Sequence, residues 1–387
     1  MKKLDDKITI GIFELSDPGF YVELEERFRK FMRKKIKNKF GSLRNFASQV
    51  KLGGITLSNI LNGKENTKLA IWLKVCNTLD IDTKELRKNI LKIKPRSGKS
   101  FLRPERLPIL PSPELASLVG HGLGDGHISK EGCFEYTNGD LNLHKKVLSI
   151  ISKLFGSYKY SEYKHKVKRR RFNTIVGKIL HLAGVPKGNK ILQSFFIPQW
   201  ILSGSKEIKK SFIRALFDDE GTVKVSCREI LIKFSKNEKY IDSLQKFMEQ
   251  ISQLLEDLDI EVTSIRKENI VIGKNGRTLQ LVLGIHGYKN FIKFSKEIVF
   301  VHEQKQRSLE RMIDSYVSFQ NRSGETQRLL YKGLSVVPLT LHDLTNKLNM
   351  TYMAAYKALR KLQGEGLVKR IGRDKEQSII WSKIKND

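Results

Sequence analysis

The sequence has few cysteines and no long apolar run. Its three cysteines, Cys76, Cys133 and Cys227, are too few and too scattered for a disulfide framework or a zinc site, and we expect all three to be buried thiols. No apolar run reaches the roughly 18 residues of a membrane-spanning helix, and the two lysines at the start precede no signal-peptide stretch. The sequence therefore predicts a cytoplasmic protein with no membrane partner.

Acidic residues are scarce relative to basic ones. The 387 residues include 72 Lys and Arg against 41 Asp and Glu, which gives a formal net charge of +31. An excess of this size attracts a polyanion over long distances and makes nucleic acid the natural partner. Hydrophobic residues make up 40% of the chain, as is typical of folded domains rather than of disordered chains.

Proline is rare outside one segment. Five of the nine prolines lie between Pro95 and Pro113, in a stretch rich in Lys and Arg that has no sustained apolar period. This composition predicts a stiff basic linker over 93–112. A second polar stretch predicts another linker over 319–333. The linkers divide the chain into residues 1–92, 113–318 and 334–387.

The first part has the pattern of a helix-turn-helix. Apolar residues recur at helical spacing in FGSLRNFASQV and LAIWLKVCNTL, on either side of GITLSNILNGKENT. Gly53 and Gly54 are expected to form the turn, and Ile55 to Leu61 a recognition helix. The pattern resembles the Cro and phage-repressor type, which implies groove contacts from Thr56, Ser58, Asn59 and Asn62. The alternative is a small helical packing module without DNA contacts.

The third part has two amphipathic helical patterns followed by two short alternating runs around a polar turn. Gly364 and Gly366 are expected to end the second helix, and Leu367 to Ile371 with Ser378 to Trp381 to form a wing. The pattern resembles a winged helix, which implies a recognition face composed of Tyr352, Tyr356, Lys357 and Arg360. Winged helices also mediate protein contacts, so DNA reading is one of two alternatives.

The middle part contains one pattern twice. PELASLVGHGLGDGHIS and KKSFIRALFDDEGTVKV each end a nearly apolar helix with an acid directly before a glycine, and each precedes a strand region, a polar turn and a long helix. When the copies are aligned on Gly126 and Gly221, small residues recur every four positions and share one helix face. Two such faces let the helices pack closely about a pseudo-twofold axis. The matched residues are Ala116, Gly120 and Gly124 with Ser211, Ala215 and Asp219.

The two aligned glycines are expected to end the helices in the left-handed conformation, which places Asp125 and Glu220 at neighbouring C-termini. Carboxylates are unfavourable there, because the last carbonyls of a helix carry partial negative charge. A divalent cation reverses that sign. Hard oxygen ligands suit Mg²⁺, and paired metal-binding carboxylates suit phosphodiester hydrolysis on two strands. The alternative is that both acid–glycine pairs merely end helices.

These two motifs resemble the paired LAGLIDADG motifs of homing endonucleases, and the resemblance covers roughly Pro113 to Ser318. It includes LHLAGVPKGNK before the second motif and YKNFIKFSKEIVFVHEQKQRSL at the end of this part. The resemblance implies that Asp125 and Glu220 are catalytic acids that hold Mg²⁺ or Mn²⁺. The backbone carbonyls of Gly124 and Asp219 are possible further ligands.

The resemblance also implies basic residues near the scissile phosphates. Lys224 is the candidate in the second copy, and the first copy offers only His127 and Lys130 in similar places. The strands of this family form a saddle on DNA, and KYSEYKHKVKRRRFN interleaves aromatic and basic residues where such strands are expected. We expect DNA contacts there from Lys164, Lys166, Lys168, Arg169, Arg170 and Arg171. The alternative is an ordinary solvated surface.

The sequence therefore predicts an α+β fold in which a helix-turn-helix domain and a winged helix flank a duplicated αββαββα core. A monomer is expected, because the duplication supplies both acids. The predicted function is metal-dependent, site-specific cleavage of double-stranded DNA. The alternative is a transcription regulator that binds DNA on the same fold without cutting it. RNA binding fits the charge but has no aromatic recognition motif, and the chain lacks the terminal residues of a splicing intein.

Overall fold

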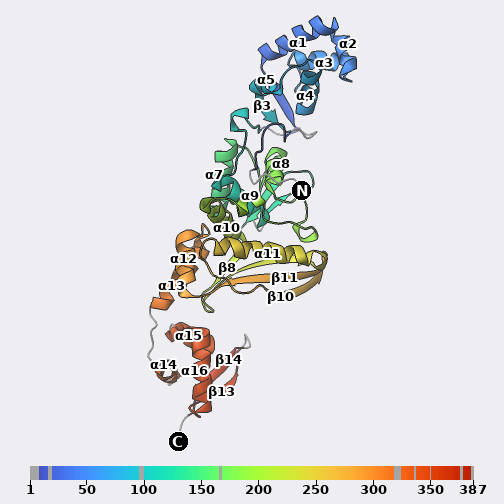
Figure 1. The fold of residues 1–387 in the computed structure, drawn as a ribbon. Helices are drawn as coiled ribbons and strands as arrows, with labels where there is room; N and C mark the ends of the chain where they lie inside the picture. The colour runs from blue at the N-terminus through green and yellow to red at the C-terminus, as the bar shows by residue number, and fades with distance from the viewer. Residues whose placement is uncertain are drawn as a thin grey trace.

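The computed structural model describes residues 8–15, 20–95, 100–164, 168–317, 324–334, 337–348, 350–374 and 378–384. Figure 1 shows the N-terminal helices, the duplicated region and the C-terminal unit following one another along the molecule. Helices and strands are both abundant, as the predicted α+β class requires. None of the helices in these ranges is long and apolar enough to cross a membrane.

The N-terminal region combines five helices with a small antiparallel sheet of order β2-β1-β3. Helices lie on both sides of the predicted turn. Gly53 directly precedes the second helix, whereas Gly54, which was also expected in the turn, is the first residue of that helix. The sheet was not predicted, because its strands are short and lie outside the periodic stretches. The elements are β1 (Tyr21–Leu24), α1 (Glu26–Phe40), α2 (Leu43–Gln49), α3 (Gly54–Leu61), β2 (Thr67–Lys68), α4 (Leu69–Thr78), α5 (Thr83–Lys88) and β3 (Ile90–Lys94).

The described parts of the predicted linker, residues 93–95 and 100–112, are packed against the rest of the protein, whereas the sequence predicts a stiff spacer over 93–112. Leu102 pairs with Ile93, and Ile109 pairs with Ile10, in isolated antiparallel bridges. Leu102, Leu107 and Ile109 are buried, and a 3₁₀ turn, η1, spans Pro104–Arg106. The apolar residues between the prolines are irregularly spaced, so no helical or strand period reveals that they belong to the core.

The middle region contains the order αββαββα twice. The sheet orders are β4-β5-β7-β6 and β8-β9-β11-β10, so the two sheets have the same topology. The first copy consists of α6 (Pro113–Leu123), β4 (Gly126–Ile128), β5 (Phe134–Asn138), α7 (Leu141–Phe155), β6 (Ser161–Lys164), β7 (Lys168–Phe172) and α8 (Thr174–Ala183). The second consists of α10 (Lys206–Glu220), β8 (Gly221–Lys224), β9 (Glu229–Asn237), α11 (Ile241–Glu256), β10 (Arg266–Gly273), β11 (Gly276–Ile285) and α12 (Tyr288–Glu297).

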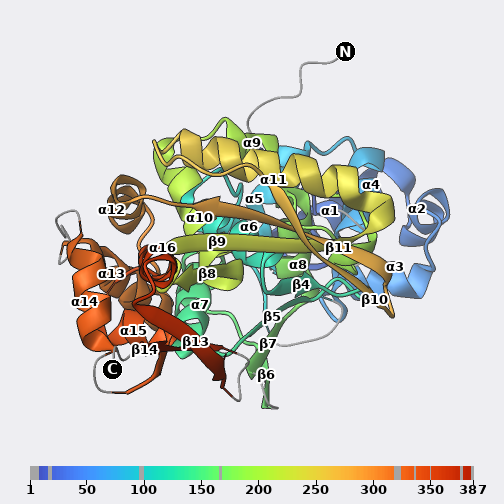
Figure 2. The same cartoon turned by 90° about the horizontal axis from the view of Figure 1, so that it is seen from below.

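Short segments connect the copies and complete the region. The turn η2 (Lys190–Leu192) and helix α9 (Gln199–Leu202) lie between the copies, η3 (Glu238–Tyr240) precedes α11, and α13 (Glu303–Val317) follows α12. In Figure 2, α11 runs along one side of the sheet that contains β9 and β11. Ile232 and Phe234 of β9 are buried, whereas the intervening Lys233 and Ser235 are less buried. Because alternate strand residues face opposite sides, the second group lies on the face away from the core.

Helices α6 and α10 pack through the face of small residues that the sequence predicts. A Cβ atom on Gly120 would lie 2.7 Å from the carbonyl oxygen of Phe212 and 2.9 Å from Cβ of Ala215. The two backbones therefore approach so closely that glycine is required at this position.

The expectation of left-handed glycines after the two motifs is wrong. Gly221 has φ −74° and ψ 153°, and Gly126 begins strand β4. Both positions need glycine for space: an added Cβ would lie 2.4 Å from the carbonyl oxygen of Phe217 at Gly221, and 2.5 Å from that of His121 at Gly126. Helix α10 turns directly into β8, whereas Gly124 and Asp125 form a short turn between α6 and β4.

The C-terminal unit has its own hydrophobic core, which includes Leu359 and Trp381. Its sheet has the order β12-β14-β13. Helix α14 contributes Leu330 to this core, so residues 325–333 belong to the unit, although the sequence predicts a linker there. The elements are α14 (Glu325–Gly333), β12 (Leu339–Thr340), α15 (Leu341–Leu348), α16 (Tyr352–Gly364), β13 (Val368–Arg373) and β14 (Ile379–Lys383).

The prediction of three buried thiols holds only for Cys76. Cys133 is half-buried, and Cys227 is exposed. Cys227 lies in the turn between β8 and β9, where the chain reverses at the protein surface.

Candidate active site

The two motif acids lie where the motif helices end. Asp125 follows the end of α6, and Glu220 is the last residue of α10. Both side chains are partly buried, and the amide of Asn138 donates a 2.7 Å hydrogen bond to Oδ2 of Asp125. The structure thus brings together the two carboxylates that the sequence singles out.

The environment of these acids disfavours their negative charge. Burial raises the pKa of Asp125 to about 6, and the nearby carboxylate of Asp219 adds to this effect. Burial likewise raises the pKa of Glu220 to about 7, with a further contribution from Asp125. A divalent cation between the carboxylates would offset both causes.

A partly buried lysine closes the end of the first motif helix. Lys190 is the first residue of η2, and its Nζ donates hydrogen bonds to four backbone carbonyls around the end of α6. The distances are 2.8 Å to Leu123, 2.9 Å to Gly126 and 3.3 Å to Gly122, and the fourth acceptor is Gly124. Burial lowers the pKa of Lys190, and the nearby carboxylates of Glu220, Asp219 and Asp125 act in the opposite direction.

A second lysine does the same for the other motif helix. Lys305 of α13 donates through Nζ to the carbonyls of Asp218 at 2.5 Å and of Phe217 and Asp219 at 3.2 Å. Burial lowers its pKa as well. Cations near a helix C-terminus stabilise it, because they interact with the partial negative charge of the last carbonyls. Each motif helix therefore has one lysine bound to the carbonyls at its end.

Neither lysine was predicted from the sequence, in which Lys224 was the candidate instead. Lys224 ends β8, in register with Glu229, whereas the lysines that act most strongly on Asp125 and Glu220 in the described structure are Lys190 and Lys305. Lys190 follows α8 and Lys305 follows α12 by a similar number of residues. An alignment of the two copies that continued past these helices would therefore have matched the two lysines. In the first copy, His127 lies on β4 opposite Glu135, and Lys130 is exposed in a turn.

The donor set fits a magnesium or manganese ion. The carbonyls of Gly124 and Asp219, which the resemblance suggests as ligands, accept hydrogen bonds from the two lysines. Among the described residues, no cluster of three or more His, Cys, Asp or Glu is arranged to hold a metal. Two carboxylate groups remain, and Mg²⁺ is commonly held by one or two carboxylates together with water and substrate phosphates.

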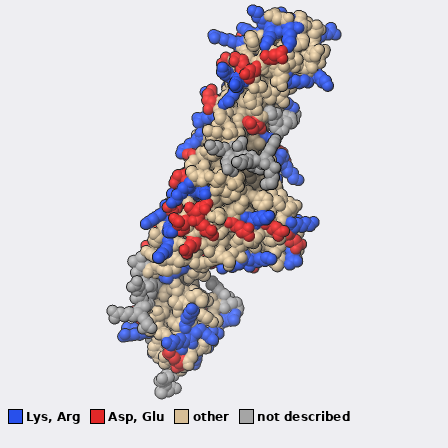
Figure 3. All heavy atoms as spheres, in the orientation of Figure 1, with Lys and Arg blue, Asp and Glu red and all other residues tan. Residues whose placement is uncertain are grey.

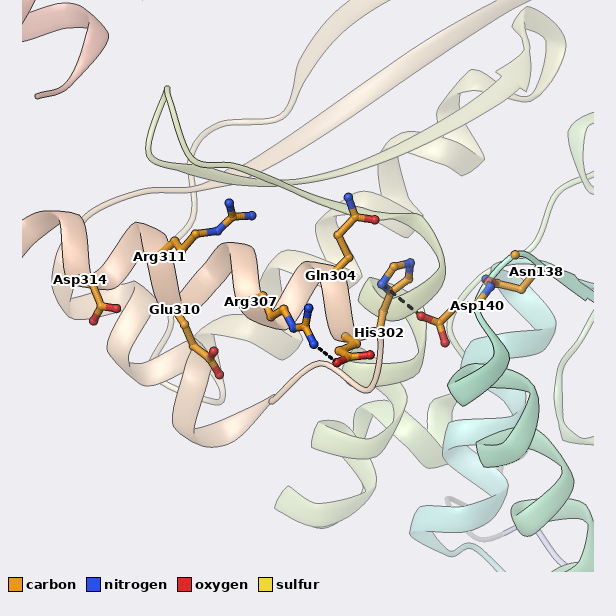
Figure 4. A pocket seen from close by; sticks show the side chains of 10 residues that line it. Asn138, Asp140, His302, Gln304, Arg307, Glu310, Arg311 and Asp314 are labelled. Carbon is orange, nitrogen blue, oxygen red and sulfur yellow. Dashed lines mark hydrogen bonds and ion pairs between the residues drawn. The ribbon is translucent and has the colours of Figure 1, made fainter. Parts of the chain in front are cut away.

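A cavity of about 1000 Å³ borders the site between the end of β5 and α13. Asn138 lies at its edge, and Nδ1 of His302 is 3.5 Å from Oδ2 of Asp140 (Figure 4). Along α13 the cavity is lined by both arginines and carboxylates, and Arg307 pairs with Glu303. This mixed charge does not favour a free anion.

The basic strand of the first sheet divides its side chains between two faces. Arg169 and Arg171 lie 3.3 and 3.4 Å from Glu135, whereas Lys168 and Arg170 lie 3.1 and 3.2 Å from Glu162. Arg170 is 8% exposed and pairs in register with the buried Tyr136. Arg170 is therefore packed towards the helices, and the expectation that the whole run faces DNA is wrong for this residue.

The other basic residues of β6 and β7 that were predicted to contact DNA lie in different positions. Arg169 and Arg171 alternate with Arg170 and point to the open face of the sheet. Lys168 pairs in register with Asn138, on the same side as Arg170. Lys164 is the last residue of β6, and Lys166 lies outside the described residues.

The predicted contacts of α3 are only partly accessible. Thr56 and Asn62 are exposed, whereas Ser58 and Asn59 are half-buried. The amide of Asn59 donates to Glu65 at 3.0 Å. On α16, Tyr352, Lys357 and Arg360 are exposed and Tyr356 is half-buried, and a cavity of about 250 Å³ lies beside the two tyrosines and Trp381.

Acidic residues gather on the helical side of the central region. Figure 3 shows them over α10 to α12, whereas Lys and Arg dominate the N-terminal helices and the C-terminal unit on the same face. Asp242, Glu249 and Glu256 of α11 are all exposed. This side of the molecule therefore carries negative charge that repels a polyanion.

Metal-free stability should depend on pH in a predictable direction. Burial raises the pKa of Asp125 to about 6 and that of Glu220 to about 7 in the folded protein, from ordinary values of 3.8 and 4.5. The folded state binds more protons across this interval, so their contribution to stability falls as pH rises through it. As pH rises, the unfolding temperature of the wild type should fall more steeply than that of the double variant Asp125→Asn/Glu220→Gln. Added Mg²⁺ should reduce this difference in slope. Equal slopes of unfolding temperature against pH in the two proteins would contradict repulsion between the two acids.

No family model matches the chain. Curated relatives include the replication factor C small subunit of Methanocaldococcus jannaschii, which is 25% identical over 330 residues that cover 81% of this chain and 16% of the relative. The tRNA-splicing ligase RtcB of Pyrococcus furiosus is 22% identical over 278 residues, covering 66% and 27%. The RNA polymerase subunit Rpo1N of M. jannaschii is 26% identical over 230 residues, covering 52% and 17%. The chain thus spans less than a third of each of these relatives.

Solved structures to which the chain is similar include a homing endonuclease, a DUF199/WhiA protein and a LAGLIDADG meganuclease. I-DmoI in complex with DNA and Mn has a TM-score of 0.35 and 19% identity, and the match covers 48% of this chain and 96% of I-DmoI. Full-length DUF199/WhiA from Thermatoga maritima has a TM-score of 0.34 and 16% identity, covering 66% and 92%. The LAGLIDADG meganuclease I-AabMI bound to uncleaved DNA has a TM-score of 0.29 and 11% identity, covering 65% and 98%.

Proposed function

We propose that the protein is a site-specific endonuclease that hydrolyses both strands of double-stranded DNA with Mg²⁺ or Mn²⁺. One observation carries this proposal: two partly buried carboxylates, Asp125 and Glu220, stand at paired helix ends, and each helix end is closed by a partly buried lysine. A site without function would have no physical reason to keep two carboxylates that repel each other. One copy of the motif would then serve each scissile phosphate.

The residues of the chain have separable roles in this reaction. Asp125 and Glu220 would hold the metal, which when bound would polarise the phosphodiester and make water a better nucleophile. Asn138 orients Asp125 through its hydrogen bond. Lys190 and Lys305 keep the helix ends in place and add positive charge where negative charge accumulates on the phosphate. Lys190 and Lys305 thus take the catalytic role that the sequence predicted for Lys224.

The flanking regions would supply additional DNA contacts. We assign α3 and α16 as recognition helices, the first in a helix-turn-helix and the second in a winged helix. Thr56 and Asn62 are the exposed residues of the first predicted face. The protein would act as a monomer, because the chain carries both copies of the motif.

The curated relatives are consistent with a homing function. Their names describe a replication factor, an RNA ligase and an RNA polymerase subunit, which share no activity. Because the chain spans only a small part of each, these activities do not describe the shared region. A homing endonuclease that resides in unrelated host proteins would produce this distribution.

Cleavage of a DNA library tests the function directly. The purified protein is incubated with random duplexes and Mg²⁺ or Mn²⁺, and any new ends are sequenced. We expect paired breaks at one sequence, and EDTA should abolish cleavage while binding persists. Cleavage that continues in EDTA would contradict the carboxylate site. Tight binding to one sequence without any cleavage would favour the regulator.

The contribution of α16 is measurable from the salt dependence of binding. Lys357→Gln/Arg360→Gln should weaken binding, and the slope of log K against log salt should become shallower by about 2, because two phosphate contacts are lost. Lys246→Gln on the exposed side of α11 is the matched control and should leave the slope unchanged. An unchanged slope in the double variant would show that α16 does not contact DNA.

A further inference from the structure

The two motif helices end differently. Helix α6 stops at Leu123, because Gly124 leaves the helical conformation at φ −78° and ψ −117°. Helix α10 continues through Glu220, the residue that corresponds to Asp125. The position of Glu220 is therefore set by its own helix, whereas Asp125 lies beyond the last helical residue of α6.

The backbone of Asp125 is held instead by a side chain from the other copy. Its N–H donates a 3.1 Å hydrogen bond to Oδ2 of Asp219. The hydroxyl of Tyr136 donates to Oδ1 of the same carboxylate at 2.7 Å, and Nδ1 of His121 lies 3.1 and 3.2 Å from the two oxygens. All three partners belong to the first copy, so one carboxylate of α10 binds three points of the opposite half.

This contact is enclosed and closely fitted. The side chain of Asp219 is 0% exposed and that of His121 is 1% exposed, so water does not replace a lost hydrogen bond. The residue of α6 that corresponds to Asp219 is Gly124, and a Cβ there would lie 2.7 Å from Oδ2 of Asp219. The carboxylate occupies the space that glycine leaves. The two copies are asymmetric at this position because only one carboxylate fits.

We propose that Asp219 is a positioning residue that holds Asp125 in its place across the interface between the copies, a role that depends on the endonuclease function proposed above. Its carboxylate replaces the helical hydrogen bonding that α10 provides for Glu220. Loss of this carboxylate should displace Asp125 while leaving Glu220 in its helix. The two strands of the DNA should then be affected unequally, because each acid serves one scissile phosphate.

Strand-resolved cleavage tests this role. A duplex carrying the selected target is labelled with a different fluorophore on each strand, and full-length Asp219→Ala is assayed with Mg²⁺. We expect the rate on one strand to fall by about a hundredfold, as small displacements of reacting groups do, and the other strand to be cut with a much smaller loss. The affected strand should be the one that Asp125→Asn also fails to cut. Asp219→Asn, which keeps an acceptor oxygen, should restore most of that rate.

Two further variants separate positioning from stability. Tyr136→Phe removes one hydrogen bond to the same carboxylate and leaves the bond from Asp125 intact, so it should show no strand bias. Gly124→Ala pushes Asp219 away from the opposite side and should reproduce the bias even if Asp219→Ala fails to fold. Equal losses on both strands in both Gly124→Ala and the folded Asp219 variants would overturn the positioning role. A wild type that cuts neither strand would overturn the endonuclease function as well.

Discussion

Asp125→Asn and Glu220→Gln should each lower the rate of DNA cleavage by about 10²- to 10³-fold without loss of the fold. A neutral amide binds a divalent cation poorly, so the water that attacks the phosphodiester is no longer activated. The side-chain volume is nearly unchanged. Because burial and neighbouring carboxylates disfavour the ionised acids, each substitution should also raise the unfolding temperature of the metal-free protein above neutral pH.

Rates on each strand, the affinity for DNA in EDTA and the unfolding temperature together check this result. The affinity should stay close to that of the wild type or rise, because a negative charge near the phosphates is removed. Glu249→Gln, an exposed acid of α11, is the matched control and should change none of the three. Variants that cut both strands at the wild-type rate would remove the two-carboxylate mechanism.

The duplicated core was predictable because its signals are local and occur twice. The apolar helices, the acid–glycine pairs and the small residues such as Gly120 and Ala215 lie within two short segments. Their repetition predicted the packing of α6 on α10 and the meeting of Asp125 with Glu220. The conformation of the glycines was not predictable in the same way. Gly126 and Gly221 are required by the space beside the preceding helix turn, which only the three-dimensional packing defines.

The lysines and the connecting segments escaped prediction for a related reason. Lys190 and Lys305 lie far in sequence from the carbonyls that they bind, and a single lysine in a polar segment has no periodic signal. The apolar residues of segment 93–112 and of α14 are similarly few and irregular. Their burial becomes visible only when Ile109 pairs with Ile10 and Leu330 enters the C-terminal core.

Lys190→Met and Lys305→Met should also reduce cleavage by about 10²-fold, with an effect on stability opposite to that of the acid variants. Methionine keeps the length of the side chain but donates no hydrogen bond, so the carbonyls around Leu123 or Asp218 lose a buried donor. Each such loss costs about 1–3 kcal/mol. The unfolding temperature should therefore fall, whereas removal of an acid raises it.

The pH dependence separates this role from a purely structural one. Both lysines lower the pKa of Asp125 and Glu220, so their removal should raise the pKa of both acids further and leave them more protonated at neutral pH. Metal binding requires the ionised carboxylates, and cleavage by the lysine variants should recover in part as pH rises, so the pH–rate profile shifts upwards. Lys224→Met supplies the decisive comparison, because Lys224 stands at the end of β8 in register with Glu229. The pH–rate profile of Lys224→Met should match that of the wild type. If Lys224→Met abolished cleavage while Lys190→Met and Lys305→Met did not, Lys224 would be the catalytic lysine. Lys190 and Lys305 would then serve the fold only.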